Sequence, residues 1–346
     1  MRTMNYQAPW WLPGGHAQTI WPALFAMRSE QSAPVYRRER WATPDADFID
    51  VDFSEPCNTP ARGLLVLFHG LEGSSASHYA LAFADYARRS GLSYAVVHFR
   101  GCSGEVNRAP RAYHSGDFEE IDWILRRMRQ RANQQGHAQL LAVGISLGGN
   151  ALMRWAGELE VQASTMVQAL AAVSAPLDLT ASGKALGQGL NRYIYTPMFL
   201  RSMKPRALQR WQLHPGLFDC QRMRSARNLY EFDNVFTAPV HGFKDAFDYW
   251  QRASAKPHLQ RIRVPSLLLN SANDPFIPAH SLPQPHEVSR QVTLWQPGQG
   301  GHVGYASGNW PAHLQAMTHA VGGFLCQHLA MAHTIAPDAE KIAVYG

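Results

Sequence analysis

The sequence has little charge and few cysteines, and each shortage excludes a class of protein. Of 346 residues, 17% are charged and 46% are hydrophobic, which leaves enough apolar surface for a large core and gives no sign of disorder. The 4 cysteines form no C-x-x-C pair, which argues against a zinc clip, a redox dithiol or a disulfide scaffold. Free thiols in a reducing compartment are the better interpretation of Cys57, Cys102, Cys220 and Cys326.

Long hydrophobic runs and targeting segments are missing as well. Residues 1–6 lack the apolar core of a signal peptide, and the longest strand-like runs are far too short to span a bilayer. The net charge of +6 comes from short, scattered basic clusters rather than from one stripe. We therefore expect a soluble, cytoplasmic protein with no nucleic acid partner, no stable membrane insertion and at most peripheral membrane contact. Nothing in the sequence indicates the oligomeric state.

Motifs for cofactors and metals are absent. The chain has neither a G-x-G-x-x-G fingerprint nor a G-x-x-x-x-G-K-[ST] loop. The histidines at 69, 78, 98 and 114 do not have the spacing of metal ligands, and there is no H-E-x-x-H segment. We expect no cofactor and no metal.

What the chain does contain is an alternation of apolar strands and amphipathic helices. Strands are expected at 64–68, 93–99, 139–145, 169–174, 266–270 and 292–295, and helices at 77–90, 117–133, 147–158 and 311–329. Strands that are apolar throughout are typical of a parallel sheet covered on both faces. The pattern predicts an α/β protein with a mostly parallel central sheet and helices on both faces.

Two segments interrupt this alternation. Residues 178–258 are richer in Arg, Tyr, Phe and Pro and show no clear strand, so we expect a mostly helical cap insertion there. The first 30 residues hold proline, paired glycines and three tryptophans, and we expect no regular element in them. We interpret residues 1–346 as one domain, with segment 1–35 packed on the body because exposed tryptophans would be costly.

A glycine-rich segment follows the strand expected at 139–145. Its sequence, GISLGG at 144–149, has the G-x-S-x-G spacing of a nucleophile elbow, in which a serine lies at a strained turn between strand and helix. Small residues are needed two positions before and after the serine, because Cβ atoms there would clash. We predict that Ser146 is a nucleophile; the alternative is a structural glycine turn.

A nucleophilic serine needs a base, and the base needs a carboxylate that orients it. In hydrolases with this elbow, the chain order is serine, acid, histidine. Asp274 follows the strand expected at 266–270, and His302 follows the strand at 292–295 on a glycine-rich loop. We predict Asp274 as the acid and His302 as the base. The alternatives are a turn aspartate before Pro275 and an ordinary histidine, since the chain has 16.

Two backbone amides are candidates for an oxyanion hole. The amide of Leu147 lies at the expected helix N-terminus, and that of Leu71 lies in the HGLEG loop after the strand at 64–68. For Leu71, the alternative is that residues 69–73 form an ordinary glycine loop. Glu72 beside it could deter anionic substrates. The RGCSG loop at 100–104 is better interpreted as structural than as part of the pocket, and nothing near Cys102 would activate it as a nucleophile.

Several motifs occur together: WLPGGHAQT at 11–19, HGLEG at 69–73, RGCSG at 100–104, YHSGD at 113–117 and GISLGG at 144–149. From about residue 10 to 329 the chain resembles the YheT-like α/β hydrolases, a family similar to medium-chain ester synthases/esterases and to animal lipid hydrolases. The resemblance implies an α/β-hydrolase fold with a helical cap, a role in lipid metabolism and a Ser146, Asp274, His302 triad. Unlike the animal members, the chain shows no N-terminal membrane anchor, and His241 and Asp245 lack the H-x-x-x-x-D spacing of acyltransfer relatives.

The leading interpretation is a serine carboxylic ester hydrolase that acts on small-molecule esters with short- to medium-chain acyl groups. Acyl transfer to an alcohol with the same triad is the first alternative. A hydrolase-fold binding protein and a basic, Trp-rich peripheral membrane module are the others, while peptidase, thioesterase and epoxide chemistry are disfavoured. Five cap residues could line the acyl pocket or form the core of the cap, namely Tyr193, Tyr195, Met198, Phe199 and Leu200.

Overall fold

The chain folds around an eight-stranded sheet with the order β1-β2-β4-β3-β5-β6-β7-β8. The computed structural model describes residues 6–27, 33–56, 61–134, 136 and 139–329. The strands from β3 to β8 are parallel to one another, whereas β2 is antiparallel to both β1 and β4. The strand bounds are β1 Arg37–Ala42, β2 Phe48–Ser54, β3 Leu64–Phe68, β4 Ser93–His98, β5 Leu140–Ile145, β6 Ala169–Val173, β7 Ser266–Leu269 and β8 Val292–Trp295.

Both faces of the sheet are covered by helices. On β3, Leu64, Val66 and Phe68 belong to one buried cluster, and Leu65 and Leu67 belong to another on the opposite face, as the two-residue period of a strand requires. The first cluster includes side chains of α3 (Phe118–Gln134), α4 (Leu147–Leu159) and α5 (Val161–Met166). The second includes side chains of α2 (His78–Arg89) and α12 (Gln315–Cys326). This confirms the expected α/β class.

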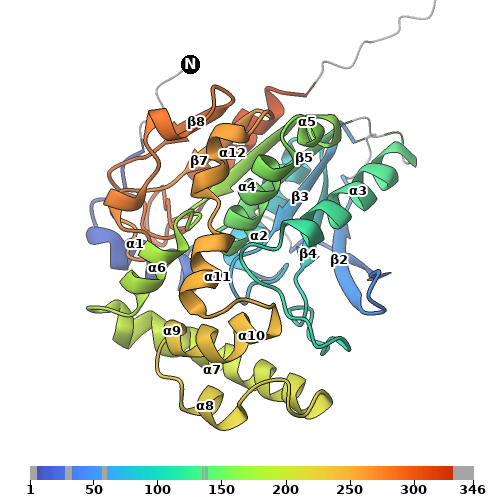
Figure 1. The fold of residues 1–346 in the computed structure, drawn as a ribbon. Coiled ribbons are helices and arrows are strands. Elements are labelled where there is room, and N and C mark those ends of the chain that lie inside the picture. Colours follow the sequence, from blue (N-terminus) through green and yellow to red (C-terminus); the bar gives the residue numbers. More distant parts are fainter. Residues whose placement is uncertain (1–5, 28–32, 57–60, 135, 137–138, 330–346) are drawn as a thin grey trace, which may run out of the picture.

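A run of helices separates β6 from β7 and has a core of its own. It consists of α6 Leu179–Leu186, α7 Asn191–Leu213, α8 Cys220–Ser225, α9 Leu229–Phe232, the short π-helix Asp233–Thr237, α10 Ala238–Val240 and α11 Ala246–Ala253. Figure 1 shows these helices gathered below one end of the sheet. Tyr195, Leu200, Met223 and Phe232 are buried in one cluster among them. Like the predicted insertion, this run contains helices and no named strand in the described chain.

The structure corrects two sequence-based expectations. The first 30 residues were expected to lack a regular element, yet α1 spans Gly14–Leu24. Its polar residues Gln18 and Thr19 are buried and bonded to loops of the body, so tertiary contacts stabilise a helix that local propensity does not favour. The strands β1 and β2 were not expected. Their sequences, RRERWA and FIDVDFS, carry charges that are paired across the sheet.

Candidate active site

Ser146 lies at a sharp turn between β5 and α4. Its backbone is strained, with φ 51° and ψ −118°. A Cβ on Gly144 would lie 2.5 Å from the Gly148 oxygen, and a Cβ on Gly148 would lie 2.4 Å from the Phe68 oxygen. Only glycine fits at both positions, because real Cβ atoms do not approach other heavy atoms so closely. The strand, turn and helix expected for a nucleophile elbow are all present.

Ser146, His302 and Asp274 form a continuous chain of hydrogen bonds. The Ser146 Oγ lies 2.9 Å from His302 Nε2, and His302 Nδ1 lies 2.9 Å from Asp274 Oδ2. An ionised carboxylate can only accept, so Nδ1 carries the ring proton and Nε2 can accept from the serine hydroxyl. The other oxygen, Asp274 Oδ1, accepts from the backbone N–H of Phe276 at 2.8 Å. The structure therefore brings the three predicted side chains together.

The N-terminal helix α1 supports the loop that carries His302. The backbone N–H of His302 donates to the Thr19 hydroxyl at 2.8 Å, and that of Gly300 donates to Gln18 Oε1 at 2.9 Å. The Asn273 amide also donates to Gln18 Oε1, at 2.9 Å. One buried glutamine thus links the loop that carries Asp274 to the loop that carries His302. Sequence reasoning missed this role, because a Gln-Thr pair in a Trp/Pro/Gly segment gives no signal of it.

In the loop after β3, two backbone amides that lie two positions apart are hydrogen-bonded to tyrosine hydroxyls. The N–H of Gly70 donates to the Tyr79 hydroxyl at 3.0 Å, and the N–H of Glu72 donates to the Tyr113 hydroxyl at 3.0 Å. His69 Nε2 accepts from the backbone N–H of Phe99, so its Nδ1 is left to donate to the Gly70 oxygen at 2.7 Å. Complete burial lowers the pKa of His69 to about 3, which keeps the ring neutral and fixes this arrangement.

Between these clamped amides, the N–H of Leu71 has no hydrogen-bond partner among the described residues, and neither has the N–H of Leu147 at the start of α4. Both leucines line the same cavity as Ser146. The two loops touch, since a Cβ on Gly70 would lie 3.2 Å from the Ser146 Cβ. The geometry leaves these two amides available to a ligand oxygen beside the serine.

Glu72 also connects this loop to the helices between β6 and β7. Tyr113 donates its hydroxyl proton to Glu72 Oε1 at 2.8 Å, and Arg206 Nε of α7 lies 3.2 Å from Glu72 Oε2. The same guanidinium lies 2.9 Å from the sulfur of Cys102. Burial raises the pKa of the Cys102 thiol to about 12, which agrees with the expectation that it is not a nucleophile.

A cavity of about 160 Å³ lies between the serine and the helices that follow β6. Most of its wall is apolar, and the apolar contributors from these helices include Leu179, Leu186, Phe199, Met203, Ala207, Leu229, Phe232, Phe236 and Trp250. Of the five side chains considered from the sequence, Phe199 lines the cavity. Tyr195 and Leu200 are buried in the cluster among the helices, while Tyr193 and Met198 are exposed.

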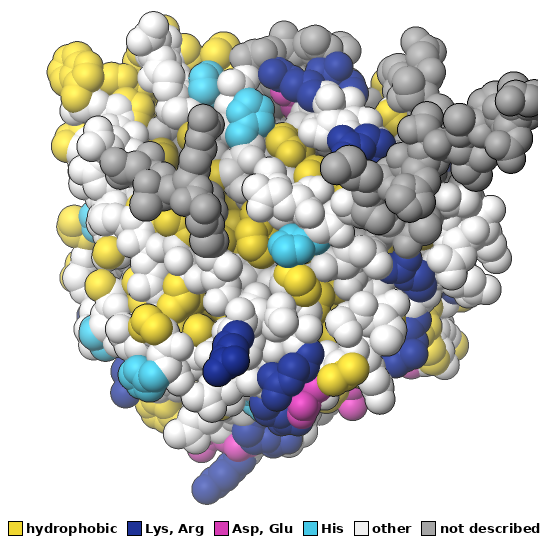
Figure 2. Space-filling view, turned by 90° about the horizontal axis from the view of Figure 1, so that it is seen from above, with side chains coloured by type: hydrophobic (Ala, Val, Ile, Leu, Met, Phe, Trp, Pro, Cys, Tyr) yellow, Lys and Arg dark blue, Asp and Glu magenta, His cyan; other side chains and the backbone are white. Residues whose placement is uncertain are grey.

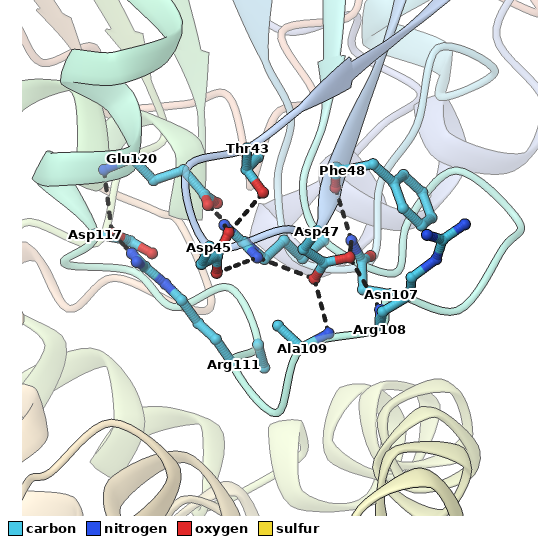
Figure 3. Close-up of polar contacts among 12 residues, drawn as sticks. Thr43, Asp45, Asp47, Phe48, Asn107, Arg108, Ala109, Arg111, Asp117 and Glu120 are labelled. Carbon is cyan, nitrogen blue, oxygen red and sulfur yellow. Dashed lines mark hydrogen bonds and ion pairs between the residues drawn. The ribbon is translucent and has the colours of Figure 1, made fainter.

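The RGCSG loop is held by a buried ionic network beside the cavity (Figure 3). Arg100 contacts the carboxylates of Asp45, Asp47 and Glu120 at 2.6 to 3.0 Å. Asp47 also accepts from the backbone N–H groups of residues 108 and 109. Although Arg100 lines the cavity, its guanidinium is committed to these partners, so the structural interpretation of this loop fits the observed contacts.

The remaining sequence candidates have structural partners. His241 bonds to the backbone oxygens of Thr237 and Ala112, and Asp245 caps the start of α11. Within the described chain, no group of three or more His, Cys, Asp or Glu side chains is arranged to hold a metal ion. No helix in the same part of the chain is long and apolar enough to span a membrane.

The sheet with its covering helices and the strand, turn and helix around Ser146 are those of an α/β hydrolase. The sequence pattern described as the alpha/beta hydrolase fold matches residues 63–308, which is more than half of the chain. The chain belongs to this family. It is 39% identical to the "Putative esterase YheT" of Escherichia coli (strain K12) over 300 residues, which span 85% of this chain and 84% of that protein. The resemblance to YheT-like hydrolases is therefore confirmed.

More distant relatives carry the names of lipid hydrolases. The phospholipase ABHD3 of Homo sapiens is 26% identical and spans 89% of this chain and 75% of its own length. The monoacylglycerol lipase of Saccharomyces cerevisiae is also 26% identical, over 79% of this chain and 61% of its own length. The chain is accordingly a member of the esterase and lipase group, and its enzyme class is that of the carboxylic ester hydrolases.

Solved structures agree on the fold. The Pyrococcus furiosus esterase Pf2001 superposes with a TM-score of 0.54 at 15% identity, over 86% of this chain and 94% of that one. Est1E of Butyrivibrio proteoclasticus, with bound ferulic acid, gives a TM-score of 0.54 at 16% identity. The superposition covers 86% of this chain and 100% of that one. At these identities the likeness concerns the fold alone.

Proposed function

We propose that this protein hydrolyses short- to medium-chain carboxylic esters through Ser146, His302 and Asp274. The observation that carries the proposal is the chain of 2.9 Å hydrogen bonds from Ser146 through His302 to Asp274, next to an apolar cavity. Ser146 attacks the ester carbonyl while His302 Nε2 takes its proton, and Asp274 stabilises the imidazolium. His302 then protonates the leaving alkoxide, and water activated by His302 releases the acid from the acyl-enzyme.

The amides of Leu71 and Leu147 are the proposed donors to the oxyanion. Each is free of partners within the described chain and lies beside the serine. In this role they would act where negative charge develops, and losing one such donor costs about 3–4 kcal/mol of barrier. The neighbouring amides of Gly70 and Glu72 are already engaged by tyrosine hydroxyls, so they do not compete for the oxyanion.

We further propose that helices α6 to α11 act as the cap of one hydrolase domain and that their apolar side chains hold the acyl group. We also propose that the protein is cytoplasmic. The described cysteines Cys102, Cys220 and Cys326 are all free thiols, which supports a reducing compartment. Cys57 lies outside the described residues.

The test is hydrolysis of p-nitrophenyl esters from acetate to laurate, together with labelling by a fluorophosphonate. Wild type should turn over the esters and be labelled, and Ser146→Ala should abolish both. Ser182→Ala is the matched control, because Ser182 lines the same cavity and its hydroxyl has no hydrogen-bond partner among the described residues. We expect this control to be labelled like wild type.

Each outcome separates two interpretations. Labelling of wild type without ester turnover, followed by product when an alcohol acceptor is added, would favour acyl transfer. Equal labelling of wild type and Ser146→Ala would mean that Ser146 is not the nucleophile. If neither protein is labelled or active, the binding-protein interpretation would replace the catalytic one.

A further inference from the structure

Most of the exposed large hydrophobic side chains in the described chain lie on two neighbouring elements. One group belongs to α1 and the loops beside it, and the other belongs to the N-terminal half of α7. We call them together the apolar face: Trp10, Leu24, Phe25, Trp310, Leu190, Tyr193, Ile194 and Met198. Trp10 is 93% exposed, Tyr193 is 75% exposed and Trp310 is 71% exposed, so these rings contact water rather than a core.

The two helices that carry the apolar face, α1 and α7, meet at a specific contact. The His16 ring of α1 stacks on the Tyr195 ring of α7 with 5.8 Å between the centroids, and His16 Nδ1 lies 3.1 Å from the Tyr195 hydroxyl. Ile20 of α1 packs against the buried cluster of the cap. Figure 1 draws α1 at the left of the molecule, beside α6. Figure 2 shows the opposite end of the molecule from α7, seen from above, where hydrophobic, basic and histidine side chains are interspersed.

Acidic side chains are missing from the segments that build this face. Residues 6–27, 179–218 and 288–329 contain no Asp or Glu. The segment 179–218 carries six Lys or Arg residues, and Arg192 and Arg201 are exposed on α7. Neither of these two arginines forms an ion pair with an acidic side chain in the described part of the chain. The face therefore combines exposed aromatic rings with uncompensated positive charge.

We propose that the apolar face docks on the surface of a lipid bilayer that contains anionic phospholipid. Tryptophan and tyrosine are favoured at the boundary between headgroups and acyl chains, because one end of each ring system is polar and the rest is apolar. Exposed arginines beside them attract the negative surface of such a bilayer. Docking would not insert a helix across the membrane. It would lay α1 and α7 in the interface.

A second copy of this chain is the rival occupant, and the charge pattern disfavours it. A two-fold contact between two such faces would bring arginines against arginines, with no carboxylate in these segments to neutralise them. An anionic bilayer supplies the opposite charge over the whole face. The same α1 helix bonds to the His302 loop through Gln18 and Thr19, so docking would hold the site against the surface where ester lipids occur.

The experiment is co-sedimentation of the full chain with two kinds of vesicle, one of phosphatidylcholine and one with about 30 mol % phosphatidylglycerol. We expect binding to the anionic vesicles that weakens at about 0.5 M salt. Trp10→Ser/Tyr193→Ser should lower the partition coefficient at least tenfold, and Arg192→Glu/Arg201→Glu should do so on anionic vesicles.

Matched controls carry the same changes elsewhere. Val35→Ser/Val161→Ser removes two exposed apolar side chains outside the face. Arg263→Glu/Arg290→Glu reverses two exposed charges just before β7 and β8, at the end of the sheet away from the triad. Both controls should sediment like wild type.

Three results would overturn the proposal. The first is that the wild type does not bind the anionic vesicles, and the second is that the face variants and the controls lose vesicle binding equally. The third result is a wild-type dimer in solution that the face variants convert to a monomer. The proposal goes beyond the ester chemistry and can be judged without it. Ser146→Ala should bind vesicles like wild type, and the face variants should cleave a soluble p-nitrophenyl ester at the wild-type rate.

Discussion

Removing the hydroxyl of Tyr113 should slow catalysis much more than it weakens substrate binding. This hydroxyl accepts from the Glu72 N–H at 3.0 Å and donates to the Glu72 carboxylate at 2.8 Å, so it holds the loop that carries the Leu71 amide. In Tyr113→Phe the ring remains and both bonds are lost. The Glu72 backbone, at φ 59°, is then free to relax from its left-handed conformation.

The size of the effect follows from the proposed role of the Leu71 amide as a donor to the oxyanion. A whole oxyanion donor is worth about 3–4 kcal/mol, and a misplaced donor retains part of this. We therefore expect kcat to fall about 10- to 100-fold, which corresponds to about 1.4–2.7 kcal/mol of barrier. KM should stay within about twofold, because the amide interacts more strongly with the oxyanion than with the ester. The affinity for a trifluoromethyl ketone inhibitor should fall in parallel with kcat/KM.

Tyr249→Phe provides the control for a simple loss of stability. The Tyr249 hydroxyl is buried at the same cavity and accepts a backbone N–H at 3.0 Å, but from Ser115 instead of the oxyanion loop. Each variant should lose about 1–3 kcal/mol of folding free energy for the unpaired buried amide. We expect kcat of Tyr249→Phe to stay within about threefold of wild type. Equal losses of kcat in the two variants would refute the positioning role of Tyr113.

Three further perturbations test the site and its surroundings. Asp274→Asn should lower kcat by about 10⁴, since an amide beside Nδ1 favours the wrong ring tautomer of His302, and an unchanged rate would remove Asp274 from the triad. Thr19→Val deprives the His302 N–H of its acceptor and should lower kcat about fivefold, with wild-type activity as the contradicting result. Burial raises the pKa of Asp233 to about 6, so the folded state holds its proton more tightly than the unfolded state. The free energy of unfolding should then fall by about 3 kcal/mol as pH rises from about 4 to 8, and denaturant titrations of Asp233→Asn should lack this fall.

The strand, turn and helix around Ser146 and the parallel strands could be predicted, because the residues that cause each element are contiguous in sequence. Runs such as 64–68 and 140–145 are apolar throughout, as strands covered on both faces must be. The strand β2, between β1 and β4, was missed because Asp50 and Asp52 interrupt its apolar pattern. Both carboxylates are buried in ion pairs, with Arg40 and Arg38 of β1, and Asp52 also contacts His98 of β4. These aspartates can be buried because their ion-pair partners lie on other strands. No pattern within the segment 48–54 alone could reveal such partners.

The supporting contacts of the site could not be predicted for a related reason. Tyr79 and Tyr113 act as acceptors for amides of another loop, and Gln18 joins two loops from the far end of the chain. Tyr113 and Gln18 lie in motifs that the chain shares with its family, but the spacing within those motifs does not specify contacts with a distant loop. No such spacing specifies the contact of Arg206 either, whose pairing with Glu72 depends on how the cap helices lie over the sheet.

The sequence by itself determined the class of fold and the strand, glycine turn and helix around Ser146, because backbone sterics and strand patterning act over a few neighbouring residues. Only the tertiary structure decided that Ser146 Oγ and His302 Nε2, from residues 156 positions apart, lie 2.9 Å from each other. It also decided which amides remain free and which side chains form the cavity wall. These features depend on distances between separate loops, and such distances are set when the sheet assembles and its parallel strands bring their carboxyl ends to one edge.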